Sequence, residues 1–290
     1  MDSSKKHEAA AELSLGAKSR LAAALLPRDD RGADTQQVPW VLIVVLALFF
    51  VVVWLFPPLG VLKQSENIFP LTLHSVEETF SFLVSLLVFA VSWNAYSRER
   101  AGNVMILACG FLAVGLLDFG HMLSYQGMPL FVTPASPQKA IVFWLAARYV
   151  AAITLLVIAL RPWVPLSHPL VRFQFLAVSL LLTAAVFLLE LNVPELWPVM
   201  FIPGQGLTPI KISAEYGIIA LLGVTAVILY RKSQVPQSFD AANLFTATLI
   251  TILSELCFTL YSNVNDVFQL MGHTYKVIAY FCIYRAVFVS

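Results

Sequence analysis

Ionisable and aromatic side chains interrupt several long apolar segments of this chain, and they do so at helical spacing. Four pairs lie three or four positions apart: His74 with Glu78, Asp118 with His121, Trp144 with Arg148, and His273 with Lys276. Residues at this spacing share one face of a helix. Imidazole and carboxylate groups from neighbouring helices are ligands that transition metals accept. The pairs therefore predict a polar site, provided that the segments carrying them are helices that lie against one another.

The residue types predict a metal site together with a surrounding ligand pocket. The predicted metal ligands are His74, Glu78, Asp118, His121 and His273. The predicted ligand-binding residues are Trp144, Arg148, Lys276, Tyr125, Tyr280 and Glu255. Zinc, iron, copper and manganese all fit this set, and no spacing rule selects among them.

Three other interpretations of the same residues stay open. Two histidines could hold a haem, with Arg148 and Lys276 pairing with its propionates, although nothing specifies the macrocycle. The two cations could instead bind an anionic small molecule without a metal. Finally, Arg148 with Asp118, and Lys276 with a glutamate, could be buried ion pairs that only fix the register of the helices.

The charge balance favours a bound cation over a bound anion. Three carboxylates (Glu78, Asp118, Glu255) face two cations (Arg148, Lys276), which leaves one negative charge in excess, 3 − 2, before the histidines are counted. An unpaired charge inside a membrane costs several kcal/mol. A transition metal would balance the excess, and its binding should weaken as the pH falls through about 6.5, because each imidazole must lose its proton to become a ligand.

The elements that position these side chains are predicted to be membrane helices. Of the 290 residues, 59% are apolar and only 12% are charged, against roughly a quarter charged in a soluble domain. Apolar segments of about 20 residues recur along the chain, and each can cross a hydrocarbon core about 30 Å thick as a helix. We expect an all-α polytopic bundle with about eight transmembrane helices, at 40–57, 71–96, 103–125, 138–160, 170–190, 212–231, 239–262 and 266–288.

Charge asymmetry predicts the orientation of this bundle. With the amino terminus inside, twelve Lys and Arg residues fall in inner segments and only three, Lys63, Lys139 and Lys211, in outer ones. The positive-inside rule then places both termini in the cytoplasm. All the site residues named above lie in the outer half of the bilayer, while Glu190 and Glu215 are expected at span ends, where a solvated charge is cheap. Residues 1–38 are predicted to be a cytoplasmic tail, disordered or partly an amphipathic helix, and residues 39–290 the membrane domain.

The segments that carry these pairs resemble the bacterial membrane-associated sensor domains, third type of the MASE series, over most of residues 40–290. The shared motifs are LHSVEETF, GLLDFGHMLSYQGM, FWLAARY and GHTYKVIAYFCIYRAVF. The resemblance implies a multi-pass protein of the bacterial inner membrane, whose bundle precedes a histidine kinase, diguanylate cyclase or cyclic-di-nucleotide phosphodiesterase, often through a PAS domain. These 290 residues depart from that pattern in containing no output domain, which we expect to lie beyond Ser290.

The leading functional prediction is a sensory input module, and we do not expect this chain itself to be an enzyme. A metal, cofactor or small ligand bound in the outer-half pocket would shift the last helix, and thereby a cytoplasmic output domain. The alternative is a metal-dependent intramembrane hydrolase, although the chain has no His-Glu-x-x-His motif and Arg148 and Lys276 oppose a cation. Expected partners are the lipid bilayer, a small ligand or metal, and a signalling domain in cis or in trans, with a homodimer as a further option. A net charge of +1 argues against nucleic acid.

Overall fold

The computed structural model describes residues 37–56, 68–261 and 263–288. Most of the predicted tail, residues 1–36, lies outside this part of the chain. The described residues form eight α-helices: α2 (Trp40–Leu55), α4 (Leu71–Asn94), α5 (Gly102–Ser124), α6 (Pro137–Leu160), α7 (Val171–Asn192), α8 (Pro209–Ser233), α9 (Ala241–Leu260) and α10 (Val267–Phe288). The all-α prediction is confirmed, and every predicted span matches a helix to within three residues at each end.

Six of these helices, α4 to α9, are long and apolar enough to cross a membrane, so the chain is a multi-pass membrane protein. The other two helices, α2 and α10, each lack one of these two properties. Helix α2 is apolar but has only 16 residues, which at 1.5 Å per residue gives about 24 Å, less than a hydrocarbon core of about 30 Å. Helix α10 has 22 residues, which is long enough, but polar residues such as His273 and Lys276 interrupt its apolar sequence.

Side-chain caps fix where three of the helices begin. Ser136 accepts a hydrogen bond from the Lys139 amide at the start of α6, and Asp240 accepts one from the Asn243 amide at the start of α9. Thr208 does the same at the start of α8, which, like α6, has a proline in its first turn. Such caps satisfy backbone N–H groups that have no acceptor within the helix. Proline is tolerated in the first turn because it has no backbone N–H to satisfy.

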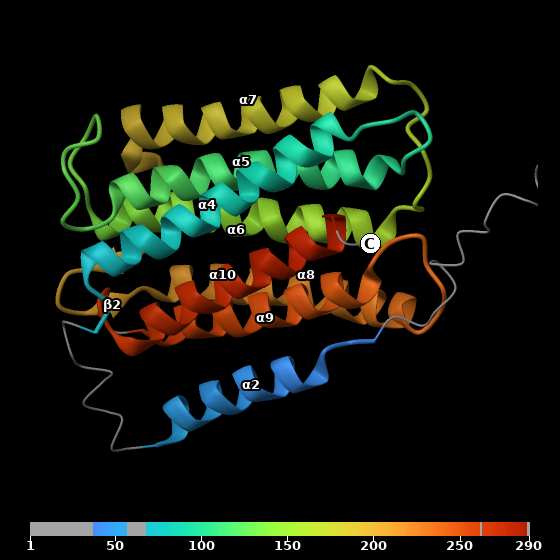
Figure 1. Ribbon diagram of the computed structural model, residues 1–290. Helices are drawn as coiled ribbons and strands as arrows, with labels where there is room; N and C mark the ends of the chain where they lie inside the picture. The colour runs from blue at the N-terminus through green and yellow to red at the C-terminus, as the bar shows by residue number, and fades with distance from the viewer. Residues whose placement is uncertain (1–36, 57–67, 262, 289–290) are drawn as a thin grey trace, which may run out of the picture. The chain divides into compact units, whose positions relative to one another are not determined.

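Six of the helices pack in a closed circuit, which we call the ring. Helix α4 packs on α5, α5 on α6, α6 on α8, α8 on α9, α9 on α10, and α10 again on α4. The helices run alongside one another as rods (Figure 1). Helix α7 packs on α5 and α6, and α2 on α9, so neither belongs to the ring. A polar side chain facing the interior of the ring is therefore shielded from lipid by helices on every side.

Close contacts at small residues hold two sides of the ring together. On α5, a Cβ added to Gly115 would lie 3.0 Å from the Cβ of Ser85 on α4. On α10, a Cβ at Gly272 would lie 2.5 Å from the ring of Phe258, and the Gly272 carbonyl accepts a hydrogen bond of 2.7 Å from Ser254 of α9. Small residues of this kind let membrane helices approach closely. Gly272 directly precedes His273, so this contact also positions the site.

The proline-rich connection between α7 and α8 is ordered and lies at the end of the ring that carries the site. It contains the 3₁₀ helix η3 (Pro194–Leu196) and a short antiparallel hairpin, β1 (Phe201–Ile202) with β2 (Gly206–Leu207). The Gln138 side chain of α6 holds it, donating to the Pro198 carbonyl at 2.9 Å and accepting from the Met200 amide at 2.7 Å. The orientation of this end, predicted to face outward, stays a prediction from charge asymmetry.

Candidate metal centre

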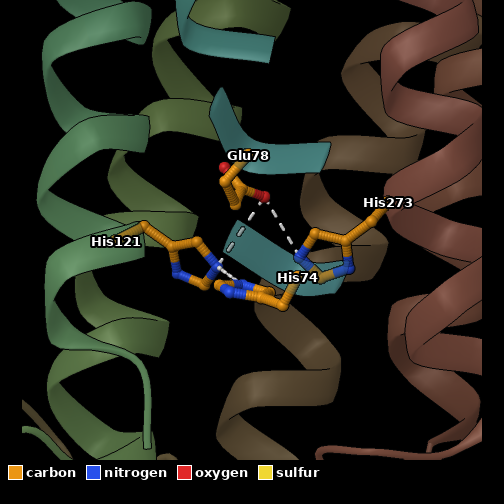
Figure 2. Close-up of side chains that lie close together, drawn as sticks. All are labelled: His74, Glu78, His121 and His273. Carbon is orange, nitrogen blue, oxygen red and sulfur yellow. Dashed lines mark hydrogen bonds and ion pairs between the residues drawn. The ribbon is translucent and has the colours of Figure 1, made fainter. Parts of the chain in front are cut away.

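Four buried side chains from three ring helices point at a common centre, shown in Figure 2. They are His74 and Glu78 of α4, His121 of α5 and His273 of α10, and one ligand atom of each lies within 4.8 Å of the others. None is more than 5% exposed. We call these four residues the His/Glu cluster. Such a cluster could hold a metal ion, because neutral imidazoles and a carboxylate are ligands for several first-row metals.

The separations within the cluster match those between ligands of one ion. His74 Nε2 lies 3.3 Å from His121 Nε2, and His273 Nε2 lies 3.1 Å from Glu78 Oε1. Two ligands bound at about 2.1 Å and at a tetrahedral angle are about 3.4 Å apart. The distance from His121 Nε2 to Glu78 Oε1 is longer, 4.0 Å, and corresponds to a wider angle at the metal. Small side-chain adjustments would therefore suffice to bind an ion.

Backbone carbonyls orient two of the imidazoles. His121 Nδ1 is 2.8 Å from the Ala140 carbonyl, and His273 Nδ1 is 2.8 Å from the Gln269 carbonyl. In each case only an Nδ1–H can donate to the carbonyl, so in the neutral form of the ring the Nε2 lone pair points into the cluster. This is the usual arrangement around metal-ligating histidines. If neither group carries a proton, His273 Nε2 and Glu78 Oε1 are two acceptors that face each other at 3.1 Å, and a bound cation or a proton on His273 would relieve this contact.

The third imidazole, His74, is held by stacking. Its ring lies 3.6 Å from the Tyr125 ring, centroid to centroid and 19° from parallel. The Tyr125 hydroxyl in turn donates to the Val264 carbonyl. No hydrogen-bond partner for His74 Nδ1 exists among the described residues. With His121 Nε2 as the acceptor, the 3.3 Å contact between the two Nε2 atoms makes His74 Nε2 the donor, so His74 can bind a metal through Nε2 only when the proton has left this atom.

Two buried ion pairs lie beside the cluster. Lys276 of α10 pairs with Glu78 Oε1, so the predicted lysine–glutamate pair forms with Glu78 and not with Glu255. Arg148 of α6 places Nη2 at 2.7 and 2.9 Å from the two oxygens of Asp118. Asp118, predicted as a metal ligand, therefore faces a guanidinium and is not one of the four residues in the His/Glu cluster, although its Oδ2 lies 3.9 Å from Lys276 Nζ.

Aromatic side chains enclose the Arg148–Asp118 pair. The Tyr280 hydroxyl donates to Asp118 Oδ2 at 2.9 Å. The guanidinium carbon of Arg148 lies 4.6 Å from the centre of the Trp144 ring and 5.4 Å from that of Tyr280. Cation–π contacts of this kind strengthen when water is excluded. The predicted ligand-binding residues Trp144 and Tyr280 thus build the surroundings of an ion pair.

Lys211 and Glu215 of α8 belong to the same layer, and the sequence interpretation missed them. Their side chains pair at 2.8 Å, and the Trp144 indole N–H donates to Glu215 at 3.2 Å. The expectation that Glu215 and Glu190 are solvated at span ends is wrong, since they are 0% and 3% exposed. Helix α8 begins three residues earlier than predicted, which places Glu215 deeper in the helix. The Lys-x-x-x-Glu spacing after the Thr-Pro cap was the available signal.

The two remaining glutamates differ in how they are satisfied. Glu255 of α9 is fully buried, and neither of its oxygens has a hydrogen-bond partner of good geometry among the described residues. Its carboxyl group adjoins that of Glu215, and the charges of Arg148 and Lys211 also act on it. Glu77, the neighbour of Glu78 in sequence, faces α10, where it accepts a hydrogen bond of 2.8 Å from the Thr274 hydroxyl. Every one of the six ring helices thus contributes to one polar layer at the same end of the bundle.

The charges of this layer leave room for a cation. If all are ionised, four carboxylates oppose three cations, an excess of one negative charge, 4 − 3, before the histidines: Glu78, Asp118, Glu215 and Glu255 against Arg148, Lys211 and Lys276. Adding the missed Lys211 and Glu215 therefore leaves the predicted balance unchanged. A proton shared by the neighbouring carboxyl groups of Glu215 and Glu255 would remove this excess. Arg148 is paired with Asp118, outside the His/Glu cluster, whereas Lys276 is paired with Glu78 Oε1, so a metal that binds Glu78 must compete with Lys276 for this oxygen.

A narrow pocket adjoins the His/Glu cluster. It encloses about 390 Å³ including its mouth, of which only about 20 Å³ can hold the centre of a water-sized molecule. Its lining includes His121 and His273 of the cluster, with Trp144, Phe258 and Tyr261 as aromatic walls. This space fits an ion with a small ligand and is too small for a macrocycle, so the geometry gives the haem interpretation no support.

The fold and the site together define a polytopic helical membrane protein with a charged layer and a candidate metal centre buried inside a ring of six helices. Residues 66–290 match the family described as membrane-associated sensor domain, MASE3, and the chain belongs to this family. The family resemblance is confirmed, and helix α2 lies before the matched residues. No curated protein and no solved structure matches this chain.

Proposed function

We propose that this chain is the sensory input module of a bacterial signalling protein, and that the His/Glu cluster binds a transition metal ion. The observation that carries the proposal is the convergence of three imidazoles and one carboxylate, whose ligand atoms lie within 4.8 Å of one another. The Nδ1 atoms of His121 and His273 are bonded to backbone carbonyls, so the Nε2 atoms of both rings face the centre, where a metal ion would bind.

The position of the cluster explains how occupancy would become a signal. His273 and Lys276 belong to α10, the last described helix, while His74 and Glu78 belong to α4 and His121 to α5. An ion held by all four residues ties α10 to two other helices of the ring. A ligand shifts an equilibrium only by binding one state more tightly than the other. The proposal therefore requires two positions of α10, of which the metal favours the one that brings His273 to Glu78.

The remaining assignments rest on the family and on the topology. Residues 39–290 would be the sensor domain in the bacterial inner membrane, with residues 1–38 a cytoplasmic tail. The inner end of α10 would lead to an output domain, a kinase or a cyclic-di-nucleotide enzyme, in cis or in trans. The hydrolase alternative has less support, because the pocket is too small for a peptide or lipid substrate and Asp118, the carboxylate next to the cluster, is paired with Arg148.

Movement of α10 is the test of this function. The three native cysteines are buried, so spin labels can be attached to cysteines introduced at the exposed Arg98 and Arg285, which follow α4 and end α10 at the same end of the bundle. Adding zinc to the metal-free protein should change the label-to-label distance distribution measured by pulsed electron resonance. The same labels in His121→Ala should show no change. An unchanged distribution in a wild-type protein that has taken up zinc would contradict signalling through α10.

A further inference from the structure

The pocket beside the His/Glu cluster touches only one side of the candidate metal centre. His121 and His273 belong to its lining, whereas His74 and Glu78 do not. An ion held by the four residues would therefore have protein ligands on three helices and one side facing the pocket. Iron(II) takes up to six ligands, and sites that bind exogenous molecules keep positions open. An open position directed into the pocket follows from this geometry, and the inference rests on the proposed metal function.

The size of the pocket limits what can occupy that position. The space available to the centre of a water-sized molecule is about 20 Å³, and about 10–15 Å³ measured in this way holds one water. Molecules of two heavy atoms fit beside the metal, whereas an amino acid, a sugar or a nucleotide does not. The pocket reaches the connections after α5 and α9 at Gln126 and Val264, which gives a small molecule a route of entry.

The walls of the pocket favour an uncharged occupant. Ala140, Ile141 and Phe258 present apolar surface. The cation in the lining, Lys211, is paired with Glu215 at 2.8 Å and donates to the Phe258 carbonyl at 2.5 Å. Among the described lining residues, no unpaired cation is left to bind an anion.

Two of the polar groups in the wall are likewise engaged elsewhere. The Trp144 indole N–H donates to Glu215 at 3.2 Å, and the Tyr125 hydroxyl donates to the Val264 carbonyl. A strongly hydrogen-bonding ligand would find these donors occupied. An apolar molecule needs no such donors, and the apolar part of the wall offers it contact surface.

We propose that the pocket admits a neutral diatomic molecule, which binds the metal at its open position as the signal that this sensor domain detects. Binding forms one metal–ligand bond and transfers no group. The ligand would alter the bonds from the metal to His121 and His273, which border the pocket, and would thereby act on α10.

The test uses iron(II) as the metal and nitric oxide as the probe. The full chain is loaded with iron(II) without oxygen, its iron content is measured, and nitric oxide is added while the electron resonance signal of the iron–nitrosyl is recorded. Ile141→Phe narrows the pocket from α6, and Val150→Phe is the matched control, because Val150 lies on the same helix but lines a separate cavity between α5, α6 and α7.

The outcomes separate the inference from the function on which it rests. We expect the wild type and Val150→Phe to bind one iron per chain and to give about one nitrosyl per iron. Ile141→Phe should keep its iron, and its nitrosyl signal should be at least tenfold weaker than that of the wild type. Full iron content with no nitrosyl in the wild type, or an equal signal in Ile141→Phe, would overturn the diatomic ligand and leave the metal site standing. Failure of the wild type to hold any metal would instead reject the proposed function.

Discussion

Replacing Arg148 with methionine is expected to lower the free energy of unfolding by about 3–5 kcal/mol, because it leaves the Asp118 carboxylate buried without its cation. Both residues are at most 1% exposed, and the guanidinium contacts both oxygens of Asp118. The double variant Arg148→Met with Asp118→Leu removes both charges and should recover most of the loss. Unfolding in micelles compares the purified wild type with Arg148→Met, Asp118→Leu and the double variant.

The exposed Arg98 provides the control for this cycle. Arg98→Met removes the same type of side chain from the surface and should change stability by no more than about 0.5 kcal/mol. If Arg148→Met were as mild as Arg98→Met, the guanidinium would not be compensating a buried carboxylate. If the double variant were less stable than either single one, the aromatic contacts of Arg148 would outweigh the ion pair.

Lys276→Met should produce a loss of similar size that added metal reverses. The Lys276 ammonium pairs with Glu78 Oε1, so its removal leaves a buried carboxylate facing His273 without compensation, at a cost of about 3–5 kcal/mol. A metal ion at a thousandfold excess over its Kd stabilises the folded state by about 4 kcal/mol. Thermal unfolding with and without zinc should therefore show near-complete rescue of Lys276→Met.

The wild type should gain less from zinc than this variant, because the ion must compete with Lys276 for Glu78. The variant that combines Lys276→Met with His121→Ala is the control, and it should stay destabilised in the presence of zinc, since the ligand set is incomplete. Zinc that fails to rescue Lys276→Met, or that rescues the double variant equally, would show that the cluster is only an ion-pair network.

The sequence predicted the helices and the faces of the site because both follow from short-range periodicity. An apolar segment of sufficient length must be a helix in lipid, and residues three or four apart must share a face. This is why His74 with Glu78, and His273 with Lys276, could be placed in one layer before any contact was known. The distance of each site residue from the outer end of its predicted span then indicated that these residues lie at a common depth in the bilayer.

What the sequence did not predict depends on which helices are neighbours and how each is rotated. Asp118 and Glu78 lie at the same predicted depth, and only the packing of α6 against α5 and of α10 against α4 decides that Arg148 pairs with the first and Lys276 with the second. Glu215 was misplaced because its burial depends on where α8 begins and on the ring around it. The pocket beside the His/Glu cluster could not be predicted either, because its shape depends on the packing and rotation of several helices together.

The X-ray absorption spectrum of metal retained by the protein, purified without chelator, tests the metal centre most directly. The account predicts about one metal per chain, surrounded by three imidazole nitrogens at about 2.0–2.1 Å and by at least one oxygen. The imidazole contribution should fall in His121→Ala and stay unchanged in His168→Ala, whose histidine is exposed outside the ring. Absence of metal from the wild type, or a first shell that His121→Ala leaves unaltered, would contradict the account.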